Sequence, residues 1–170
     1  MELTKDEEKS LNGEHGEVLQ TAYRILSATG EATDAEKLVP IDWAHVSGVN
    51  YNTIGDAGEE FLATLSKNAK FKVRTTVNPM GYDKDSVEKF GLDENFIQKQ
   101  ESIRESYKKM GVIPSFSCIP YEIYDMPQEG TQVAFAETNA AIYANSIGKL
   151  KTNKESAFSC LLYTSDAADE

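Results

Sequence analysis

The chain has 170 residues, 40% of them apolar and 26% charged, which is the composition of a globular protein large enough for one real core. Its net charge of -11 and the lack of a Lys/Arg cluster argue against a nucleic-acid partner, because phosphate backbones require a basic surface. No apolar run approaches the length that spans a bilayer, and the polar first ten residues are not a secretory signal, so we expect no membrane partner and a cytoplasmic protein.

The first part of the chain predicts two helices. Thr4 followed by Glu7 is the pattern of a capping box and marks a helix start, and Gly13 marks the end of that helix. A second helix is predicted at about 14–29, because apolar side chains recur there at the spacing of one helix face. Gly30 is the expected C-cap of this second helix.

A glycine-rich stretch then separates two short predicted strands from a helix. The strands are expected at 38–41 and 44–46, and the helix at 58–65. Asp56 is the expected N-cap of this helix, with Glu59 as its capping-box partner. A loop that leads into a helix N-terminus exposes main-chain N–H groups and suits a carboxylate or phosphate, although such loops are also ordinary connectors.

The rest of the chain alternates strands with helices. In order, we expect a half-buried strand at 71–76, a short helix at 85–90, a longer helix at 95–110 capped by Gly111, a strand at 115–119 and a helix at 138–147. This alternation predicts an α/β fold with a mainly parallel sheet. No repeat, low-complexity tract or linker marks a domain boundary inside the chain.

Three further polar segments are candidate binding elements. The turn at 78–81 (NPMG) follows a predicted strand and is either a plain connector or a loop that contacts substrate. Residues 137–139 (ETN) open a helix, with Thr138 or Asn139 as possible caps. The lysines of 151–154 (KTNK) would suit a carboxylate or phosphate, although lysines are more often solvated surface residues.

Cysteine and histidine are scarce in this chain. Cys118 lies at the end of a predicted strand, where ligands gather in open α/β sheets, but most free cysteines are small buried apolar residues. The two histidines, His15 and His45, are too isolated to form a metal site. His45 precedes the glycine-rich stretch and is either an acid–base group or, more commonly, a structural or surface residue.

Several strings, taken together and in order, resemble the aconitase X family. They are 46–49 (VSGV), 53–58 (TIGDAG), 76–81 (TVNPMG), 114–121 (PSFSCIPY), 136–146 (AETNAAIYANS) and 151–154 (KTNK). The resemblance runs from Leu3 to about Ser159 without a large gap. The family usually shows W-A-E-S and R-T-N-R where this chain has Phe135 before Ala-Glu-Thr and lysines at 151 and 154, so no bidentate guanidinium is available at those two positions.

The resemblance implies a partial three-layer aconitase-like α/β domain of an iron–sulfur-dependent hydro-lyase. It implies a small hydroxy-acid substrate such as cis-3-hydroxy-L-proline or 5-phosphomevalonate, and a small swivelling subunit as partner. It makes Cys118 a candidate thiolate ligand of the cluster, whose other ligands would lie outside this chain. The candidate substrate-binding residues are Ser47, Gly48, Thr53, Gly55, Asp56, Asn78, Glu137, Thr138, Asn139, Thr152 and Asn153. The general base is not identified.

The last residues do not continue the resemblance. Residues 160–170 (CLLYTSDAADE) look like one reading frame of a transposase-type sequencing adapter, and they lack the periodicity of the preceding segments. We therefore expect residues 1–159 to be the truncated N-terminal part of a catalytic domain and 160–170 to be a non-native tail. Without that tail Cys118 is the one cysteine, so we expect the fragment alone to be inactive.

Two alternatives stay open on the residues alone. One is a small non-catalytic α/β module that binds an anion and needs no further cysteine. The other is an unrelated dehydratase or sugar-acid enzyme that uses the glycine-rich loop to hold an anionic substrate. Absence of iron from the full-length protein would favour either alternative over the cluster-dependent hydro-lyase.

Overall fold

The computed structural model of the chain describes residues 1–83, 85 and 87–153. Its main-chain contacts divide it into two compact units, residues 1–40 and residues 41–170. No shift in composition marks this division in the sequence.

The first unit contains helices α1 (Lys5–Leu11) and α2 (Glu17–Ala32). The predicted capping box is confirmed, because the Glu7 N–H donates to Thr4 Oγ1 at 3.3 Å while the Thr4 N–H donates to Glu7 Oε2 at 2.6 Å. The prediction that Gly30 caps α2 is wrong, since the helix continues through this buried glycine. A Cβ atom there would lie 2.4 Å from Met1 Sδ, so the glycine serves a close approach and not a helix end.

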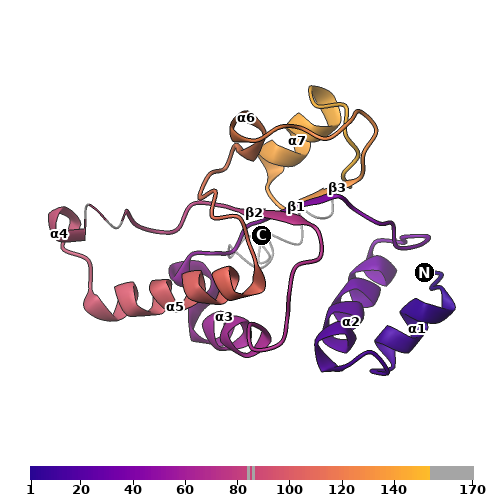
Figure 1. The fold of residues 1–170 in the computed structure, drawn as a ribbon, viewed down its shortest axis with the longest axis horizontal. Helices are drawn as coiled ribbons and strands as arrows, with labels where there is room; N and C mark the ends of the chain where they lie inside the picture. Colours follow the sequence, from indigo (N-terminus) through magenta and orange to yellow (C-terminus); the bar gives the residue numbers. More distant parts are fainter. Residues whose placement is uncertain (84, 86, 154–170) are drawn as a thin grey trace. The chain divides into compact units, whose positions relative to one another are not determined.

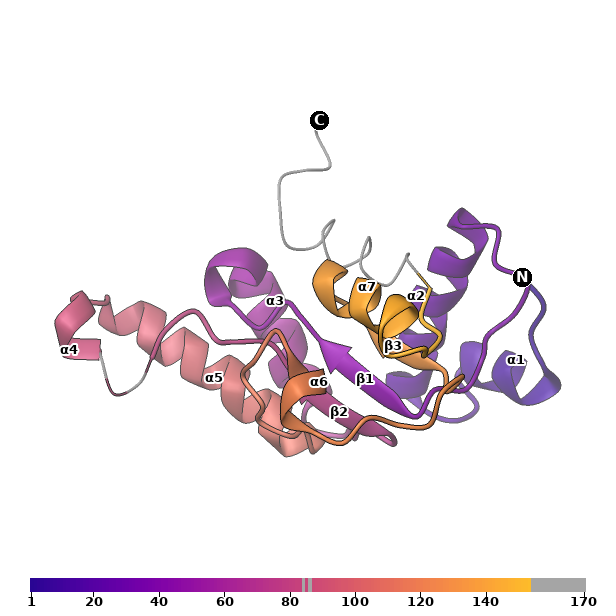
Figure 2. The same cartoon turned by 90° about the horizontal axis from the view of Figure 1, so that it is seen from above.

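The second unit is built on a three-stranded parallel sheet. Its strands are β1 (Trp43–Val46), β2 (Arg74–Val77) and β3 (Val133–Phe135), in the order β2-β1-β3. Figure 2 looks down on this sheet and shows β1 between the other two strands. Trp43 pairs with Arg74 on one side and with Val133 on the other. The predicted α/β class with a parallel sheet is confirmed.

Helices cover both faces of this sheet and give three layers (Figure 1). One face carries α3 (Tyr51–Leu65) and α5 (Glu94–Met110), and the other carries α6 (Pro120–Ile123) and α7 (Thr138–Ser146). The short α4 (Val87–Phe90) precedes α5. Each face has its own apolar core: Val49, Leu62, Val77, Ile103, Tyr107, Met110 and Val112 on the α3/α5 side, and Trp43, Val133, Phe135, Ala140, Ala144 and Leu150 on the other.

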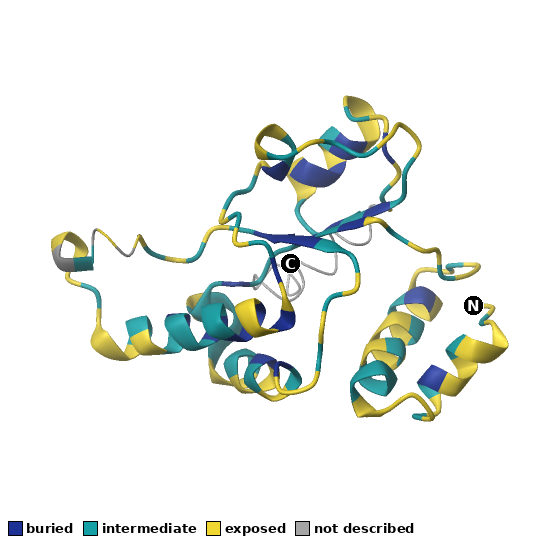
Figure 3. Cartoon of the chain, in the orientation of Figure 1, coloured by how far each residue is buried: buried dark blue, intermediate teal, exposed yellow. Residues whose placement is uncertain are grey.

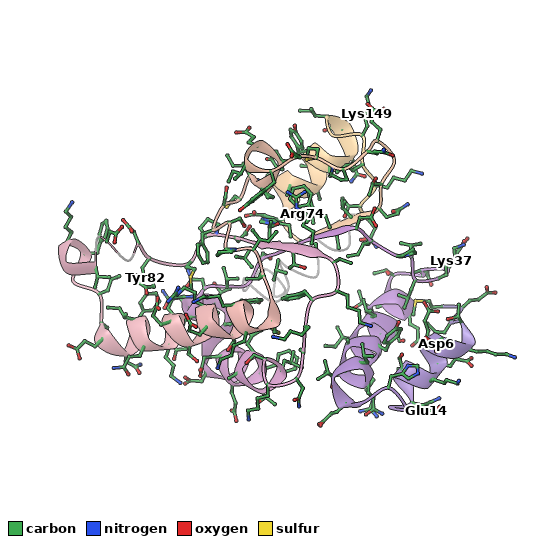
Figure 4. The ribbon with its side chains drawn as sticks, viewed as in Figure 1. Asp6, Glu14, Lys37, Arg74, Tyr82 and Lys149 are labelled. Carbon is green, nitrogen blue, oxygen red and sulfur yellow. The ribbon has the colours of Figure 1, made fainter. Side chains whose placement is uncertain are left out.

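Burial follows these layers, with the buried residues concentrated in the strands and on the inner faces of α5 and α7 (Figure 3). Arg74 closes the α7-side core, because its guanidinium carbon lies 4.1 Å from the centre of the Trp43 ring and 5.2 Å from that of Tyr124 (Figure 4). One of its nitrogens also donates to the Asp125 carbonyl at 2.7 Å. An arginine that stacks on two rings in this way covers apolar surface while its charge stays accessible to water.

The helix predicted at 95–110 is confirmed as α5, which begins one residue earlier, at Glu94, and ends at the predicted C-cap Gly111. Asp93 is the N-cap of α5, and its carboxylate accepts from the Asn95 and Phe96 N–H groups at 2.9 and 3.1 Å. Gly111 ends the helix at φ +91°, a left-handed conformation that glycine adopts without a steric penalty. The helix predicted at 138–147 is likewise confirmed as α7.

Other predicted boundaries are wrong for local physical reasons. Residues 38–41 form no strand, and Pro40 within them lacks the N–H that a ladder needs. Residues 115–119 also form no strand, because Phe116 turns the chain with φ +43°. The strand predicted at 71–76 begins at Arg74, and β3 was not predicted because three residues give too short a pattern. Of the helix predicted at 85–90, residues 87–90 form α4, and residue 86 lies outside the described residues.

Both outer strands are bordered by extended segments that pair through a single residue. Beside β2, Thr76 pairs with Ile113, and the Ile113 N–H donates to the Thr75 carbonyl at 2.7 Å. Beside β3, Gln132 pairs with Lys151, whose carbonyl accepts from the Val133 N–H at 2.9 Å. The sheet is therefore bordered on each side without a further regular strand in the described part of the chain.

Candidate functional site

A cavity of about 660 Å³ opens at the carboxyl end of the sheet. Its walls come from the segments that follow all three strands: Ser47, Gly48, Val49, Asn50 and Thr53 after β1, Asn78 and Pro79 after β2, and Ala136, Glu137, Thr138, Asn139 and Ile142 after β3. The chain leaves β1 toward α3 on one face and leaves the neighbouring β3 toward α7 on the other (Figure 1). Such a divergence between neighbouring parallel strands is where open α/β sheets bind ligands.

The glycine-rich segment enters helix α3 earlier than the sequence predicts. The helix begins at Tyr51, and Asn50 is its N-cap, with Oδ1 accepting from the Asn52 N–H at 3.0 Å. Gly55 interrupts the helix with φ +59° and ψ −166°, so the segment after it is a second helical stretch joined at a kink. The predicted strand at 44–46 is confirmed as part of β1, while the predicted helix start at 58 is wrong.

The predicted capping box of Asp56 and Glu59 is also wrong. The Asp56 carboxylate accepts from the Tyr51 hydroxyl at 3.0 Å and lies 3.0 Å from Lys99 Nζ, while Glu59 lies 3.1 Å from the same ammonium. Hydrogen bonding from Lys99, followed by that from Tyr51, lowers the pKa of Asp56. Both carboxylates therefore fasten α3 to Lys99 of α5, and neither Gly55 nor Asp56 lines the cavity.

We expect Gly55→Ala to lower the free energy of unfolding by about 2 kcal/mol, because its backbone region is populated almost only by glycine. A Cβ there meets no atom within 4 Å, so the effect comes from the backbone alone. Gly111→Ala is the matched control, since it also has open space but a left-handed φ that costs about 1 kcal/mol. Urea unfolding of both variants measures the difference, and equal losses would contradict the special role of the kink.

The first N–H groups of α3 are already hydrogen-bonded within the protein. The Tyr51 N–H donates to Gln100 Oε1 at 2.8 Å, the Asn52 N–H to its N-cap, and the Thr53 N–H to the Asn50 carbonyl at 3.0 Å. The glycine-rich loop therefore offers fewer main-chain donors to an anion than its sequence pattern suggests. Donors for a ligand come instead from side chains and from the start of α7.

The turn after β2 is joined to β1 by main-chain and side-chain bonds. The Asn78 N–H donates to the Val46 carbonyl at 3.0 Å, and Asn78 Oδ1 lies 2.6 Å from His45 Nε2. His45 is 1% exposed, so it is a structural residue of the sheet and not a surface one. Burial lowers the pKa of His45 to about 4, and the hydrogen bond to Asn78 only partly offsets this effect. The imidazole is therefore neutral at neutral pH.

The segment after β3 brings a carboxylate and a thiol together. Burial, and then the negative charge of Glu137 and a hydrogen bond to it, raise the pKa of the Cys118 thiol. Glu137 Oε2 is buried and has no hydrogen-bond partner among the described residues. Glu137 is also the N-cap of α7 and makes no side-chain cap bond, so the expected caps, Thr138 and Asn139, are wrong. Asn139 instead donates from Nδ2 to the Cys118 carbonyl at 3.1 Å.

The KTNK segment does not line the cavity. Thr152 is fastened to α7, where its N–H donates to Asn145 Oδ1 at 3.2 Å and its carbonyl accepts from Asn145 Nδ2 at 2.9 Å. Asn153 is exposed at the end of the described part. Lys154 lies outside the described residues. The cavity walls accordingly contain no lysine or arginine among the residues that the structure describes.

The described residues do not complete a metal or cluster site. Nowhere in 1–83, 85 and 87–153 do three His, Cys, Asp or Glu side chains gather as a metal would require. Cys118 is the free cysteine of this part, and Cys160 lies outside it with the rest of the predicted tail. The chemistry of Cys118 fits a single thiolate ligand, and the other ligands that a cluster requires are not found beside it.

Two polar side chains that shape the site, Asn50 and Gln100, were not predicted from the sequence. Asn50 lines the cavity and caps α3, and a Cβ on Gly81 would lie 2.6 Å from its Nδ2, so that glycine makes room for the cap. Gln100 is fully buried on α5 and supports the loop from below. A signal for Gln100 was present, because it falls four residues after Phe96 and three before Ile103 on the apolar face.

These features define an α/β domain with a polar ligand cavity at the switch point of its parallel sheet. A family model described as "Aconitase X first domain" matches residues 1–164. The crystal structure of Thermococcus kodakaraensis aconitase X (holo-form) superposes with a TM-score of 0.81 at 40% identity, covering 96% of this chain and 41% of that one. The chain therefore belongs to the aconitase X family.

Curated relatives agree with this assignment. The phosphomevalonate dehydratase large subunit of Methanocaldococcus jannaschii is 45% identical over 162 residues, which is 95% of this chain and 40% of that protein. The cis-3-hydroxy-L-proline dehydratase of Hypocrea jecorina is 34% identical over 155 residues, or 91% of this chain and 26% of that protein. The chain thus spans about two fifths or less of the relatives it matches.

No helix in the described residues has the length and apolar character needed to cross a membrane.

Proposed function

We propose that the chain is the N-terminal part of the catalytic subunit of a hydro-lyase that removes water from a small hydroxy acid. The observation that carries this proposal is the cavity at the carboxyl ends of β1, β2 and β3. Seven of the eleven residues proposed to bind substrate lie in its walls: Ser47, Gly48, Thr53, Asn78, Glu137, Thr138 and Asn139. The other four, Gly55, Asp56, Thr152 and Asn153, are not among its wall residues; of these, Asp56 binds Lys99 of α5 and Thr152 binds Asn145 of α7.

The donors of this cavity are suited to anionic oxygens of a substrate. Asn78 presents an amide, and the main-chain N–H groups of 138–140 at the start of α7 make no hydrogen bond to another described residue. A helix N-terminus favours negative charge through its dipole. Because these donors are neutral, the cavity would hold a carboxylate or phosphate by hydrogen bonding, with any counter-charge supplied from outside the described residues.

Glu137 indicates that the site is incomplete without a further group. A buried carboxylate oxygen that lacks a partner is unfavourable by about 1–3 kcal/mol or more. A substrate hydroxyl, or a polar group from the remainder of the subunit, would satisfy it. We propose that Cys118, beside it, is one thiolate ligand of an iron–sulfur cluster whose other ligands lie outside the described chain.

Among small hydroxy acids, 5-phosphomevalonate is the first candidate and cis-3-hydroxy-L-proline the second. Five relatives named as phosphomevalonate dehydratase large subunits are 40–45% identical to this chain, whereas two named as cis-3-hydroxy-L-proline dehydratases are 34% identical. The name "large subunit" supports a small-subunit partner for this protein as well. A cytoplasmic location stays a prediction from the sequence.

The proposal is tested on the full-length protein, expressed with its small subunit under reducing conditions. We expect loss of water from 5-phosphomevalonate, which is monitored through the absorbance of the conjugated product. For Asn78→Ala we expect kcat/KM to fall about tenfold or more. Asn68→Ala, at an exposed position away from the cavity, is the matched control and should be unchanged. If the enzyme dehydrates neither 5-phosphomevalonate nor cis-3-hydroxy-L-proline, the proposal is overturned and a non-catalytic anion-binding module is favoured.

The extent of the domain is a proposal of its own. We propose that residues 1–159 belong to the catalytic domain and that 160–170, which lie outside the described residues, are not native. Coverage of about 40% of the related large subunits supports a longer chain. Sequencing the source locus through the codon for Ser159 decides it: an open frame with further cysteines supports the proposal, and a frame that keeps CLLYTSDAADE and then stops contradicts it.

A further inference from the structure

Four side chains form a continuous line of hydrogen bonds through the sheet to the cavity wall. Trp43 Nε1 donates to Thr76 Oγ1 at 2.9 Å, Thr76 Oγ1 lies 2.8 Å from His45 Nδ1, and His45 Nε2 lies 2.6 Å from Asn78 Oδ1. The first three residues are at most 1% exposed, while Asn78 lines the cavity. The line therefore runs from the buried centre of β1 and β2 to the proposed substrate.

The distances favour one direction for each hydrogen bond in this line. The Trp43 indole can only donate, so Thr76 Oγ1 accepts from it and has its own hydrogen to give. The nearer of two acceptors for that hydrogen is His45 Nδ1 at 2.8 Å, since the Ala44 carbonyl is 3.4 Å away. A neutral imidazole that accepts at Nδ1 carries its proton on Nε2 and donates to Asn78.

This direction fixes the orientation of the Asn78 amide. Its oxygen is occupied by the His45 Nε2–H, so its amide nitrogen, with two hydrogens, is the end that stays available to a ligand. A rotation of the amide by half a turn would place two donors against each other and lose the 2.6 Å bond. The cavity wall thus carries a donor, which suits an anionic oxygen.

We propose that His45 is a positioning residue that holds the Asn78 amide with its nitrogen toward an anionic oxygen of the substrate. This inference rests on the proposed function in one respect, namely that Asn78 contacts substrate. The burial that keeps the imidazole neutral supports it, because a protonated ring would need Nδ1 to donate as well.

The tautomer is tested first, on the 170-residue chain, without any assay of activity. The chain has two histidines, His15 and His45. In the His15→Gln variant, the histidine nitrogen resonances that remain therefore belong to His45. With ¹⁵N-labelled histidine at pH 7, we expect Nδ1 to resonate as a bare nitrogen and Nε2 as a protonated one. Thr76→Val, which keeps the shape and removes the hydroxyl, should weaken this preference, because only the bond from Nε2 to Asn78 then remains. The opposite tautomer, or an average of the two, would overturn the proposal.

The consequence for binding is tested on the full-length enzyme by a double-mutant cycle. We expect His45→Leu and Asn78→Ala each to lower kcat/KM by about tenfold, and the double variant to lose no more than either one. His45→Gln, whose side chain keeps a donor at the same end, should recover part of the loss. Additive losses, or a glutamine no better than leucine in folded variants, would overturn the proposal. Inactivity of the unaltered enzyme would overturn the proposed function alone and leave the tautomer to decide the positioning.

Discussion

Replacing Gln100 with methionine is expected to lower the free energy of unfolding of the second unit by about 3 kcal/mol, through two backbone groups left without partners. Gln100 is fully buried and binds the loop after β1 at two points, accepting from the Tyr51 N–H at 2.8 Å and donating to the Val49 carbonyl at 2.6 Å. Methionine has a similar volume and can make neither bond. The loss therefore measures the hydrogen bonds and not a cavity.

The measurement is unfolding in urea, monitored through tryptophan fluorescence. Trp43 is the single tryptophan of the chain and is 1% exposed within β1, so its emission reports on the second unit alone. Gln98→Met is the matched control, because it makes the same replacement at an exposed position two residues earlier on the same helix. Equal stabilities for the two variants would show that the loop holds its shape without Gln100.

The stability of the second unit is expected to fall as the pH is lowered from about 6.5 to 4, with His45 contributing about 3 kcal/mol of this loss. Burial lowers the pKa of His45 from 6.5 to about 4 in the folded chain. Between these values the unfolded chain takes up a proton that the folded chain does not, so protons favour unfolding. Above pH 6.5 both states are neutral and the contribution disappears.

Carboxyl groups in proteins also titrate below about pH 6.5. The contribution of His45 is therefore measured as a difference between variants. Unfolding free energies of the parent chain and of His45→Gln are compared at pH 7, 5.5 and 4 by Trp43 fluorescence. We expect the free energy of unfolding of the parent chain, relative to that of His45→Gln, to decrease by about 3 kcal/mol between pH 7 and pH 4. His15→Gln lies in the first unit and should give a curve parallel to the parent. Parallel curves for His45→Gln would contradict the assignment.

The sequence predicted the elements whose signals are local and strong. For helix α5, the apolar face and the C-cap Gly111 were recognised without tertiary structure, whereas the side-chain cap at Asp93 was not predicted. The alternation of strands and helices was enough for the parallel sheet. The strand predicted at 115–119 is absent, because Phe116 adopts a positive φ of +43°, for which this sequence carries no signal.

The candidate site shows the same limit. The resemblance to aconitase X, in the strings at 46–58, 76–81 and 136–146, predicted Ser47, Asn78 and Glu137. The structure places all three in the walls of one cavity, at the end of the parallel sheet. Asp56 looked like a cap because of its spacing from Glu59, but Lys99 of α5 binds both carboxylates. That contact joins positions about 40 residues apart, and one sequence contains no signal for it.

The borders of the sheet have a consequence for self-association. A short parallel sheet normally offers unpaired main-chain groups on its outer strands, and these groups recruit strands from other molecules. Here the Ile113 and Ser117 N–H groups bind β2 carbonyls, and Lys151 exchanges two bonds with the strand-edge segment at 131–133. The flanking segments take up these groups in irregular geometry, with a kink at Phe116 that no incoming strand can follow in register. Within the described part of the chain, the small sheet is thereby a poor template for cross-β growth.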